Sequence, residues 1–328
     1  MGGKAQYGFH RVCPEQDAAK AVSYSDAVNR RDWRIFQDFA MSLIPKALEL
    51  YKADPIEPDI ENTVYAFDST TINLCLSVFG WADFRKTKAG IKLHTLLNLR
   101  GSIPAQIAIS NAKPHDVSGM DRIEPERGAI YLWDKAYLDF SRLYLWTSWC
   151  ILCHAQQGQY PYEETLFQPR GQEYGCSMWP DCCSGDKKSV QDYPKPLRRV
   201  KFKDPETGKV YVYLSNNFEL SAVTIAQLYK ARWQIELFFK WVKQNLHIES
   251  FFGQSENAVK SQIWIAIAAY LLIAIYKKNA KIASPLSEIL HFFSGVLFEQ
   301  IPIPSLFQEF NYTNQSTQSA KQLSLLHS

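Results

Sequence analysis

The stretch from Leu220 to Asn245 is predicted to form one long helix, and its polar side chains constrain the fold more than any other feature. At about 100° per residue, four of them fall within about 60° of one another on the helix surface: Tyr229, Arg232, Glu236 and Lys243. Such a charged stripe is commonly solvated. The rest of the helix is crowded with apolar side chains, namely Trp233, Leu237, Phe238, Trp241 and Val242. We therefore expect a helix packed on most sides, whose polar stripe lines a cleft.

Two further acids follow predicted strands. Asp68 ends the apolar run from Tyr65 to Phe67, and Asp134 ends the run from Tyr131 to Trp133. If the two strands are adjacent and parallel, both acids lie at the same edge of the sheet. Taken alone, an aspartate at a strand end is also typical of a turn or a helix cap.

Asp68, Asp134 and Glu236 have no cysteine or histidine partner at metal-ligand spacing, so they suit Mg²⁺ or Mn²⁺ rather than Zn²⁺. Two such ions about 4 Å apart activate a water or a 3′-hydroxyl and stabilise the leaving oxygen in phosphoryl transfer. Arg232 and Lys243 would hold substrate phosphates beside the ions. The pattern indicates nuclease or strand-transfer chemistry.

The order of predicted elements is that of a mixed α/β protein. A helical region over 24–52 and a Pro-rich linker near 53–62 precede three β-rich runs, of which the last two are joined by a tight hairpin at 100–102. A fourth strand ends at Asp134, a helical stretch follows from Leu138, and a later strand near 209–217 precedes the long helix. The net charge of +3 and the pI of about 8.3 favour an anionic partner without naming one.

The first 16 residues lack the apolar core of a secretory signal, so we expect a reducing cytoplasm as the location. The longest apolar run, 263–276, has 14 residues and is too short to cross a bilayer. We expect a buried core helix there and no membrane partner.

Three segments, "AFDST", "WDKAYLDF" and "YKARWQIELFFKWVKQNL", resemble the DDE signature of bacterial insertion-sequence transposases, in the group with a Tyr-Arg-Glu-Lys helix. Other stretches, such as "GIKLHTLLNLRGSIPAQIAISNAKPHD" and "SENAVKSQIWIAI", are similar to the same group. The resemblance covers roughly 24–145 and 186–277.

The resemblance implies an α/β fold of the ribonuclease H-like kind, a mixed sheet flanked by helices with a β-rich insertion between the second Asp and the Glu. It implies a metal-binding catalytic triad of Asp68, Asp134 and Glu236 holding two Mg²⁺ or Mn²⁺ ions. Family members cleave transposon ends and use the 3′-hydroxyl to attack the other strand or the target, as dimers on paired ends. By the same carry-over, double-stranded DNA is contacted by Tyr229, Arg232, Lys243 and Lys135.

The resemblance also divides the chain. We expect a truncated N-terminal helical region over 1–55, the two parts of the catalytic domain over 60–145 and 211–277, the insertion region over 146–210, and a C-terminal tail over 278–328. Members of the family usually carry a longer N-terminal region that recognises terminal repeats, and we expect this region to be missing or scrambled here before about residue 24. End recognition is therefore open.

Residues 146–184 form an unusual segment, with five of the seven cysteines and one basic residue, Arg170. A shift of the reading frame by one base permits strings over 147–159 and 164–175 that are richer in Lys and Arg and resemble the family's insertion. We therefore predict that 145–184 is translated out of frame between two compensating frameshifts, so that the insertion is disrupted or disordered. Buried thiols and a zinc site are alternatives, although Cys182 and Cys183 lack the spacer of a zinc ribbon.

Three functions remain open at this point. The Tyr-Arg-Glu-Lys helix favours a DDE transposase over a ribonuclease H-like metal-dependent nuclease, whereas the segment 146–184 favours a decayed, non-catalytic DNA-binding remnant. The two histidines nearest the predicted site, His94 and His115, are expected to be a packed and a loop residue, and neither is expected to be catalytic.

Overall fold

The computed structural model describes residues 26–27, 29–75, 77, 79–85, 88–112, 116–146, 150–155, 174–178, 191–195, 197–205, 207–245 and 251–296. The strands are β1 (Val64–Leu74), β2 (Asp83–Arg85), β3 (Lys88–Asn98), β4 (Ile103–Asn111), β5 (Ile130–Trp133), β6 (Cys150–Ala155), β7 (Tyr174–Met178), β8 (Arg198–Lys203) and β9 (Val210–Ser215). The helices are α2 (Arg34–Tyr51), α3 (Phe140–Leu145), α5 (Ala222–Ala231), α6 (Trp233–Asn245), α7 (Glu256–Asn279) and α8 (Leu286–Val296). Short 3₁₀ turns include η2 (Asp116–Arg122) and η3 (Lys135–Tyr137).

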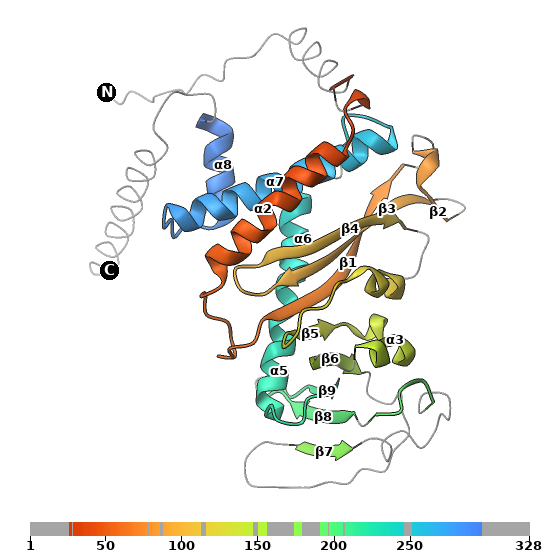
Figure 1. The fold of residues 1–328 in the computed structure, drawn as a ribbon, viewed down its shortest axis with the longest axis vertical. Coiled ribbons are helices and arrows are strands. Elements are labelled where there is room, and N and C mark those ends of the chain that lie inside the picture. The colour runs from red at the N-terminus through yellow and green to blue at the C-terminus, as the bar shows by residue number, and fades with distance from the viewer. Residues whose placement is uncertain are drawn as a thin grey trace, which may run out of the picture.

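The nine strands of the described residues belong to one mixed sheet, in the order β2-β3-β1-β5-β6-β9-β8-β7, with β4 paired to β3 (Figure 1). β5 is parallel to both β1 and β6, whereas β3 is antiparallel to β1, and β9 is antiparallel to β6. The predicted mixed sheet flanked by helices is confirmed.

The predicted hairpin at 100–102 joins β3 to β4. Gly101 and Ser102, in the four-residue connection between Asn98 and Ile103, both have positive φ angles, 74° and 55°, which glycine adopts without strain. A Cβ atom on Gly101 would lie 2.1 Å from the ring of Tyr51, at the end of α2. The glycine therefore serves both the turn and the close approach of the hairpin to the helix.

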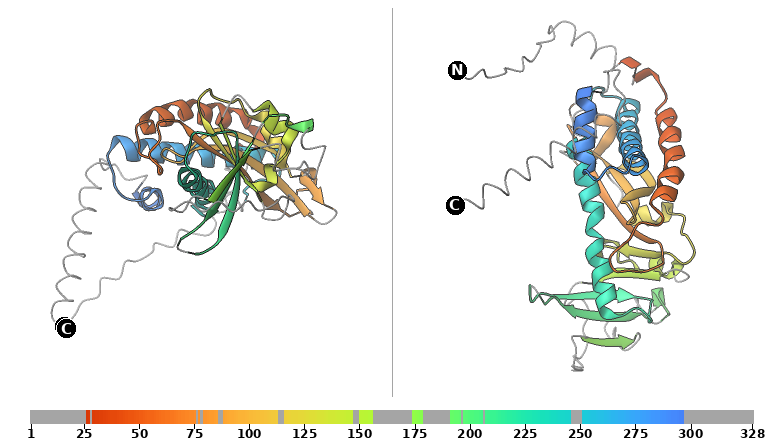
Figure 2. Two further views of the ribbon diagram at one scale, coloured as in Figure 1. Left: turned by 90° about the horizontal axis from the view of Figure 1, so that it is seen from below. Right: turned by 90° about the vertical axis from the view of Figure 1, so that its left-hand side faces the viewer.

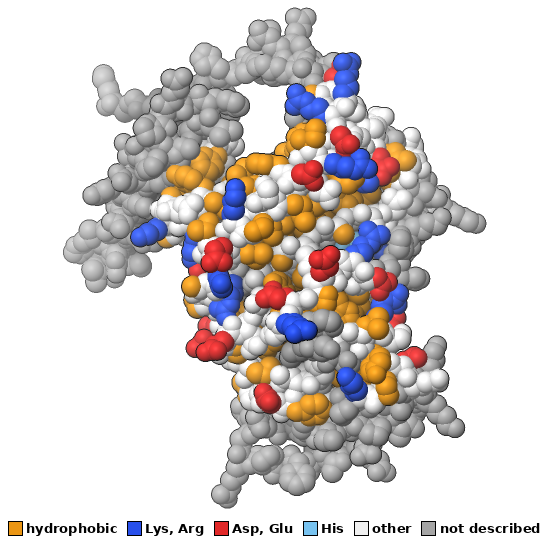
Figure 3. Space-filling view, viewed as in Figure 1, with side chains coloured by type: hydrophobic (Ala, Val, Ile, Leu, Met, Phe, Trp, Pro, Cys, Tyr) orange, Lys and Arg blue, Asp and Glu red, His pale blue; other side chains and the backbone are white. Residues whose placement is uncertain are grey.

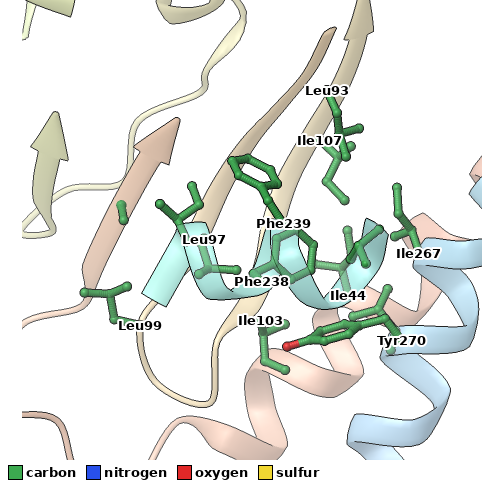
Figure 4. Packing of buried hydrophobic residues seen from close by; sticks show 14 of the residues in the cluster. Ile44, Leu93, Leu97, Leu99, Ile103, Ile107, Phe238, Phe239, Ile267 and Tyr270 are labelled. Carbon is green, nitrogen blue, oxygen red and sulfur yellow. The ribbon is translucent and has the colours of Figure 1, made fainter. Parts of the chain in front are cut away.

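Alternating side chains of β1 and β5 divide the core in two. Ala66 of β1 and Leu132 of β5 face a layer formed by α2, α6 and α7, whereas Phe67 and Trp133 face η3 and α3 in an aromatic cluster. Figure 4 shows the first layer, where α6, α2 and α7 meet the β3–β4 hairpin through Phe238, Phe239, Ile44, Ile267, Tyr270, Leu97 and Ile103. On the face shown in Figure 3, acidic and basic side chains are interspersed with apolar ones.

The predicted core helix is confirmed as α7. In the part of the chain that the structure describes, it is the one helix long and apolar enough to cross a membrane, with 24 residues. Most of its apolar stretch is buried in the protein, and it packs along α2 (Figure 1). A helix that is apolar on most sides is expected in the interior of a large domain.

Two element boundaries differ from the prediction. Asp68 does not end its strand: β1 runs on to Leu74, because the residues after Asp68 continue to pair with β3, from Ser69 opposite His94 to Leu74 opposite Ala89. The predicted long helix is α5 followed by α6, which run nearly along one line (Figure 2). Arg232 at their junction keeps helical backbone angles, φ −53° and ψ −29°.

Two parts of the unusual segment 146–184 form strands of the sheet. Residues 150–155 form β6 between β5 and β9, and residues 174–178 form β7 at the edge of the sheet. Strand pairing uses backbone groups that every non-proline residue carries, so an unusual composition does not prevent it. The other residues of 147–184 and the cysteine side chains of the segment lie outside the described part, and the frameshift stays a prediction.

The predicted N-terminal region, 1–55, and the predicted C-terminal tail, 278–328, are each described only in part. Residues 1–25 and 297–328 lie outside the described part. Within the predicted tail, 286–296 form α8, whose Ile289 is buried against Ile273 of α7.

Candidate active site

Asp68 and Asp134 are neighbours because β1 and β5 are parallel. Phe67 pairs with Trp133, so the next residue along each chain is the aspartate. Alternation along the strands places both acids on the face covered by α6, opposite Phe67 and Trp133. The Asp134 carboxylate also accepts a hydrogen bond from the Lys135 backbone N–H at 2.6 Å and caps η3, so the local role considered for this acid is present as well.

Arg232 connects the sheet to α6. Its Nη1 lies 3.3 Å from Asp68 Oδ2, and its Nη2 lies 2.7 Å from Glu236 Oε1. The arginine side chain is only 9% exposed. One buried guanidinium therefore brings together a strand carboxylate and a helix carboxylate that are far apart in the sequence.

Tyr229 of α5 lies beside the second aspartate, Asp134. Its hydroxyl lies 3.5 Å from Asp134 Oδ1, and its ring centroid lies 5.0 Å from that of Tyr213 on β9. The Arg232 guanidinium lies 5.5 Å from the centre of the same Tyr229 ring, within the range of a cation–π contact. The polar stripe predicted on this helix, which includes Glu236, thus faces Asp68 and Asp134.

An open pocket of 560 Å³ lies beside these groups. It is lined by Asp68, Ser69, Thr70, Glu236, Phe239, Lys240, Lys243 and Gln244. The Lys243 ammonium donates a hydrogen bond to the Thr71 carbonyl at 3.0 Å, and Lys240 is exposed one turn before it. Two carboxylates and two ammonium groups therefore border one solvent-accessible space.

The surroundings of Asp68 change the pKa of this acid. Burial raises the pKa of Asp68, and the negative charges of Asp134 and Glu236 raise it further, while the Ser69 N–H and Arg232 act in the opposite direction. Burial lowers the pKa of Arg232, but the surrounding tyrosine and carboxylates outweigh it and the net shift is upward. The cluster therefore holds more negative charge than its arginine compensates, and a further cation would be favoured there.

Three carboxylates suit a hard divalent ion as ligands, although these three do not converge on one point. Among the described residues no group of three or more His, Cys, Asp and Glu side chains lies close enough together to hold a metal. Arg232 lies between Asp68 and Glu236 instead. The candidate ligands are all carboxylates, and Asp68 is only 21% exposed, which is the chemistry that Mg²⁺ and Mn²⁺ require. With Arg232 moved from between them, Asp68, Asp134 and Glu236 would supply the ligands of such an ion.

Sequence reasoning missed Tyr137, a residue of η3. This side chain is buried, and its hydroxyl lies 3.1 Å from Ser69 Oγ and 3.4 Å from Asp68 Oδ1. Its ring contacts Phe67 edge to face at 5.1 Å between centroids. Its position three residues after Asp134, in a tight turn, was a usable signal.

The remaining predicted residues are placed as follows. Lys135 is exposed beside Asp134. His94 is a packed histidine, as predicted, 3% exposed with Nε2 2.9 Å from Ser110 Oγ. His115 lies outside the described residues.

The chain matches the family of the transposase DDE domain over residues 60–272, which include Asp68, Asp134 and Glu236. A protein of Sinorhizobium fredii named as transposase y4zB is 31% identical over 253 residues, covering 73% of this chain and 68% of the relative. A protein of Geobacillus stearothermophilus named as a transposase for insertion sequence element IS5377 is 29% identical, covering 70% of this chain and 62% of the relative. A Synechocystis protein named as a transposase for element IS4SA is 23% identical over 312 residues, 89% of this chain and 82% of the relative.

This chain therefore belongs to the DDE transposase family. Members are DNA transposases, which carry out phosphoryl transfer on DNA and use divalent metal ions. The matches span about two thirds of the length of the first two relatives, 68% and 62%. Among solved structures, the piggyBac transposase in a synaptic complex with hairpin DNA aligns with a TM-score of 0.44 and 11% identity, over 76% of this chain and 56% of that chain.

Proposed function

We propose that this chain cleaves DNA and transfers strands at the ends of an insertion sequence, with Asp68, Asp134 and Glu236 as the metal-binding catalytic residues. The observation that carries the proposal is the meeting of these acids: parallel pairing puts the aspartates side by side, and Arg232 joins Asp68 to Glu236. The mixed sheet, with one acid in β1 and the next directly after β5, supports a ribonuclease H-like domain.

In the proposed mechanism, two Mg²⁺ or Mn²⁺ ions would activate the attacking water or 3′-hydroxyl and stabilise the leaving oxygen. The protein holds Asp68 in place through the Ser69 N–H at 2.7 Å and the Tyr137 hydroxyl. Lys243 and Lys240 border the pocket beside Glu236, where their charges would attract a DNA phosphate. In this proposal the carboxylates would bind the metal ions and the ammonium groups would bind the DNA phosphate.

The proposed partners are double-stranded DNA, as terminal repeats and as target, and a second copy of the chain on paired ends. The DNA contacts would come from Tyr229, Arg232, Lys243 and Lys135. The net charge of +3 and the basic side chains at the pocket support an anionic partner. We place this activity in the cytoplasm, where the element's DNA is.

A cleavage assay on DNA carrying the element's own ends tests the proposal. Asp68→Asn, Asp134→Asn and Glu236→Gln should each lower Mg²⁺-dependent cleavage by about 10³-fold or more, roughly 4 kcal/mol of lost transition-state stabilisation. Glu126→Gln is the matched control, because this carboxylate accepts a hydrogen bond from Tyr65 at 2.6 Å near the start of β1, away from the proposed site. Cleavage that is equal in wild type and Glu236→Gln would remove Glu236 from the mechanism.

A decayed DNA-binding remnant is the second candidate, favoured by the single basic residue between positions 146 and 184. It would bind the ends in a gel-shift assay without Mg²⁺-dependent cleavage, and resequencing codons 140–190 would show the two frameshifts. A general nuclease would instead cut unrelated DNA as well as the ends.

A further inference from the structure

Arg232 lies between two of the three acids of the proposed metal site. Its guanidinium forms ion pairs with Asp68 Oδ2 at 3.3 Å and with Glu236 Oε1 at 2.7 Å, and its side chain is 9% exposed. Its Nε–H has no hydrogen-bond partner within the described part of the chain. A buried guanidinium with one unsatisfied donor is held by charge rather than by a complete set of hydrogen bonds.

The negative charges of the three carboxylates favour a cation between them. Asp68, Asp134 and Glu236 carry three formal negative charges, and Arg232 compensates one of them. A carboxylate removed from water is costly unless a cation or several donors accompany it. The planar guanidinium suits this task because it can face two carboxylates at once.

A divalent ion would compete for the same groups. It would bind carboxylate oxygens of Asp68 and Glu236, and like charges at short range repel one another strongly in a partly buried site. Both of Arg232's carboxylate partners are proposed metal ligands, so the ion and the guanidinium cannot both keep their best contacts.

We propose that Arg232 is the resident counter-ion of the metal-free site and that a divalent ion displaces it from at least one of its two carboxylates. This inference rests on the proposed function. The Tyr229 ring, 5.5 Å from the guanidinium, keeps a favourable contact for the displaced charge. The displaced guanidinium is then available to a DNA phosphate, so that metal binding prepares the phosphate contact.

Metal binding and stability test the inference without an activity assay. Arg232→Ala should bind Mn²⁺ at least about tenfold more tightly than wild type in a calorimetric titration, because the competing charge is gone. In EDTA the variant should unfold at a lower denaturant concentration than wild type, and Mn²⁺ should restore most of the difference. Arg232→Gln, which keeps a donor without the charge, should show the same gain in affinity if the alanine variant does not fold.

Arg142→Ala is the matched control. Arg142 also joins two carboxylates, with Nε 3.0 Å from Asp121 and Nη1 2.6 Å from Asp139, away from the proposed site. Its removal should lower stability equally with and without Mn²⁺ and leave the Mn²⁺ affinity at the wild-type value.

A second probe is chemical rescue. Methylguanidinium should stabilise Arg232→Ala in EDTA and weaken its Mn²⁺ binding, and it should do neither for Arg142→Ala. Wild-type or weaker Mn²⁺ affinity in both Arg232 variants would overturn the inference and leave the proposed metal site intact. Absence of Mn²⁺ binding in wild type and variants alike would overturn both the inference and the proposed function.

Discussion

Replacing Tyr137 with phenylalanine removes a single buried hydroxyl from the proposed site. The hydroxyl lies 3.1 Å from Ser69 Oγ and 3.4 Å from Asp68 Oδ1, while the ring is packed against Phe67 and Trp133. The substitution keeps the ring contacts. Tyr137 is therefore a positioning residue for Asp68, and its loss should affect the carboxylate more than the fold.

The magnitude follows from the geometry. A net hydrogen bond contributes about 1 kcal/mol, so the free energy of unfolding in EDTA should fall by about that amount. Removing a group that orients a metal ligand typically costs 10- to 100-fold in metal affinity, and the contact of 3.4 Å is long. We therefore expect Mn²⁺ affinity and Mg²⁺-dependent cleavage each to fall by about tenfold, or about 1.4 kcal/mol.

Tyr131→Phe is the matched control for Tyr137→Phe. Tyr131 belongs to the same aromatic cluster, but its hydroxyl accepts a hydrogen bond from the Glu126 backbone N–H at 2.6 Å, towards the other end of the strands. Denaturant unfolding in EDTA should show a similar loss of stability for both variants. If titration calorimetry also gave the same Mn²⁺ affinity for both, Tyr137 would have no positioning role.

Three further results are expected. Gly101→Ala should lower the free energy of unfolding by about 3 kcal/mol, because φ is positive there and the new Cβ would lie 2.1 Å from the Tyr51 ring. Gly128→Ala should lower it by only about 1 kcal/mol, because φ is also positive but the space around the new Cβ is open. Equal losses for the two variants in urea unfolding would argue against the clash with Tyr51. Burial raises the pKa of Asp139, but hydrogen bonds from the first turn of α3 outweigh it and the net shift is downward. The charge thus stabilises the fold above the unfolded pKa: Asp139→Asn should lose about 0.5–1 kcal/mol at pH 6–8, and the difference should shrink as the pH falls below about 4 and vanish below the lowered pKa of the folded state. Lys243→Gln should reduce the salt dependence of DNA binding by about one unit of slope if the ammonium contacts a phosphate, and an unchanged slope would exclude that contact.

Local sequence patterns predicted much of the candidate site. Helical spacing places Arg232 and Glu236 four residues apart on one face, and the structure pairs them at 2.7 Å. The apolar run before Asp134 predicted a strand that ends at this acid, and β5 ends at Trp133. Period-two alternation then determines which face of the sheet both aspartates occupy.

Contacts between distant segments could not be read from the sequence. The pairing of Arg232 with Asp68 joins positions 164 residues apart, which helical spacing does not address. The extension of β1 beyond Asp68 depends on a partner strand, since Thr70 and Thr71 are also acceptable in a turn. Likewise, β6 forms within an unusual stretch because backbone groups, rather than side chains, pair it with β5 and β9.

The most direct test of the central claim is to map the metal site on the chain itself. Fe²⁺ bound in place of Mg²⁺, with ascorbate and peroxide, generates radicals that cut the backbone beside the ion. We predict cuts near Asp68, Asp134 and Glu236 that excess Mg²⁺ suppresses and Glu236→Gln abolishes. Cuts near only one of these positions, or the same pattern in the Glu236→Gln variant, would contradict a shared metal site.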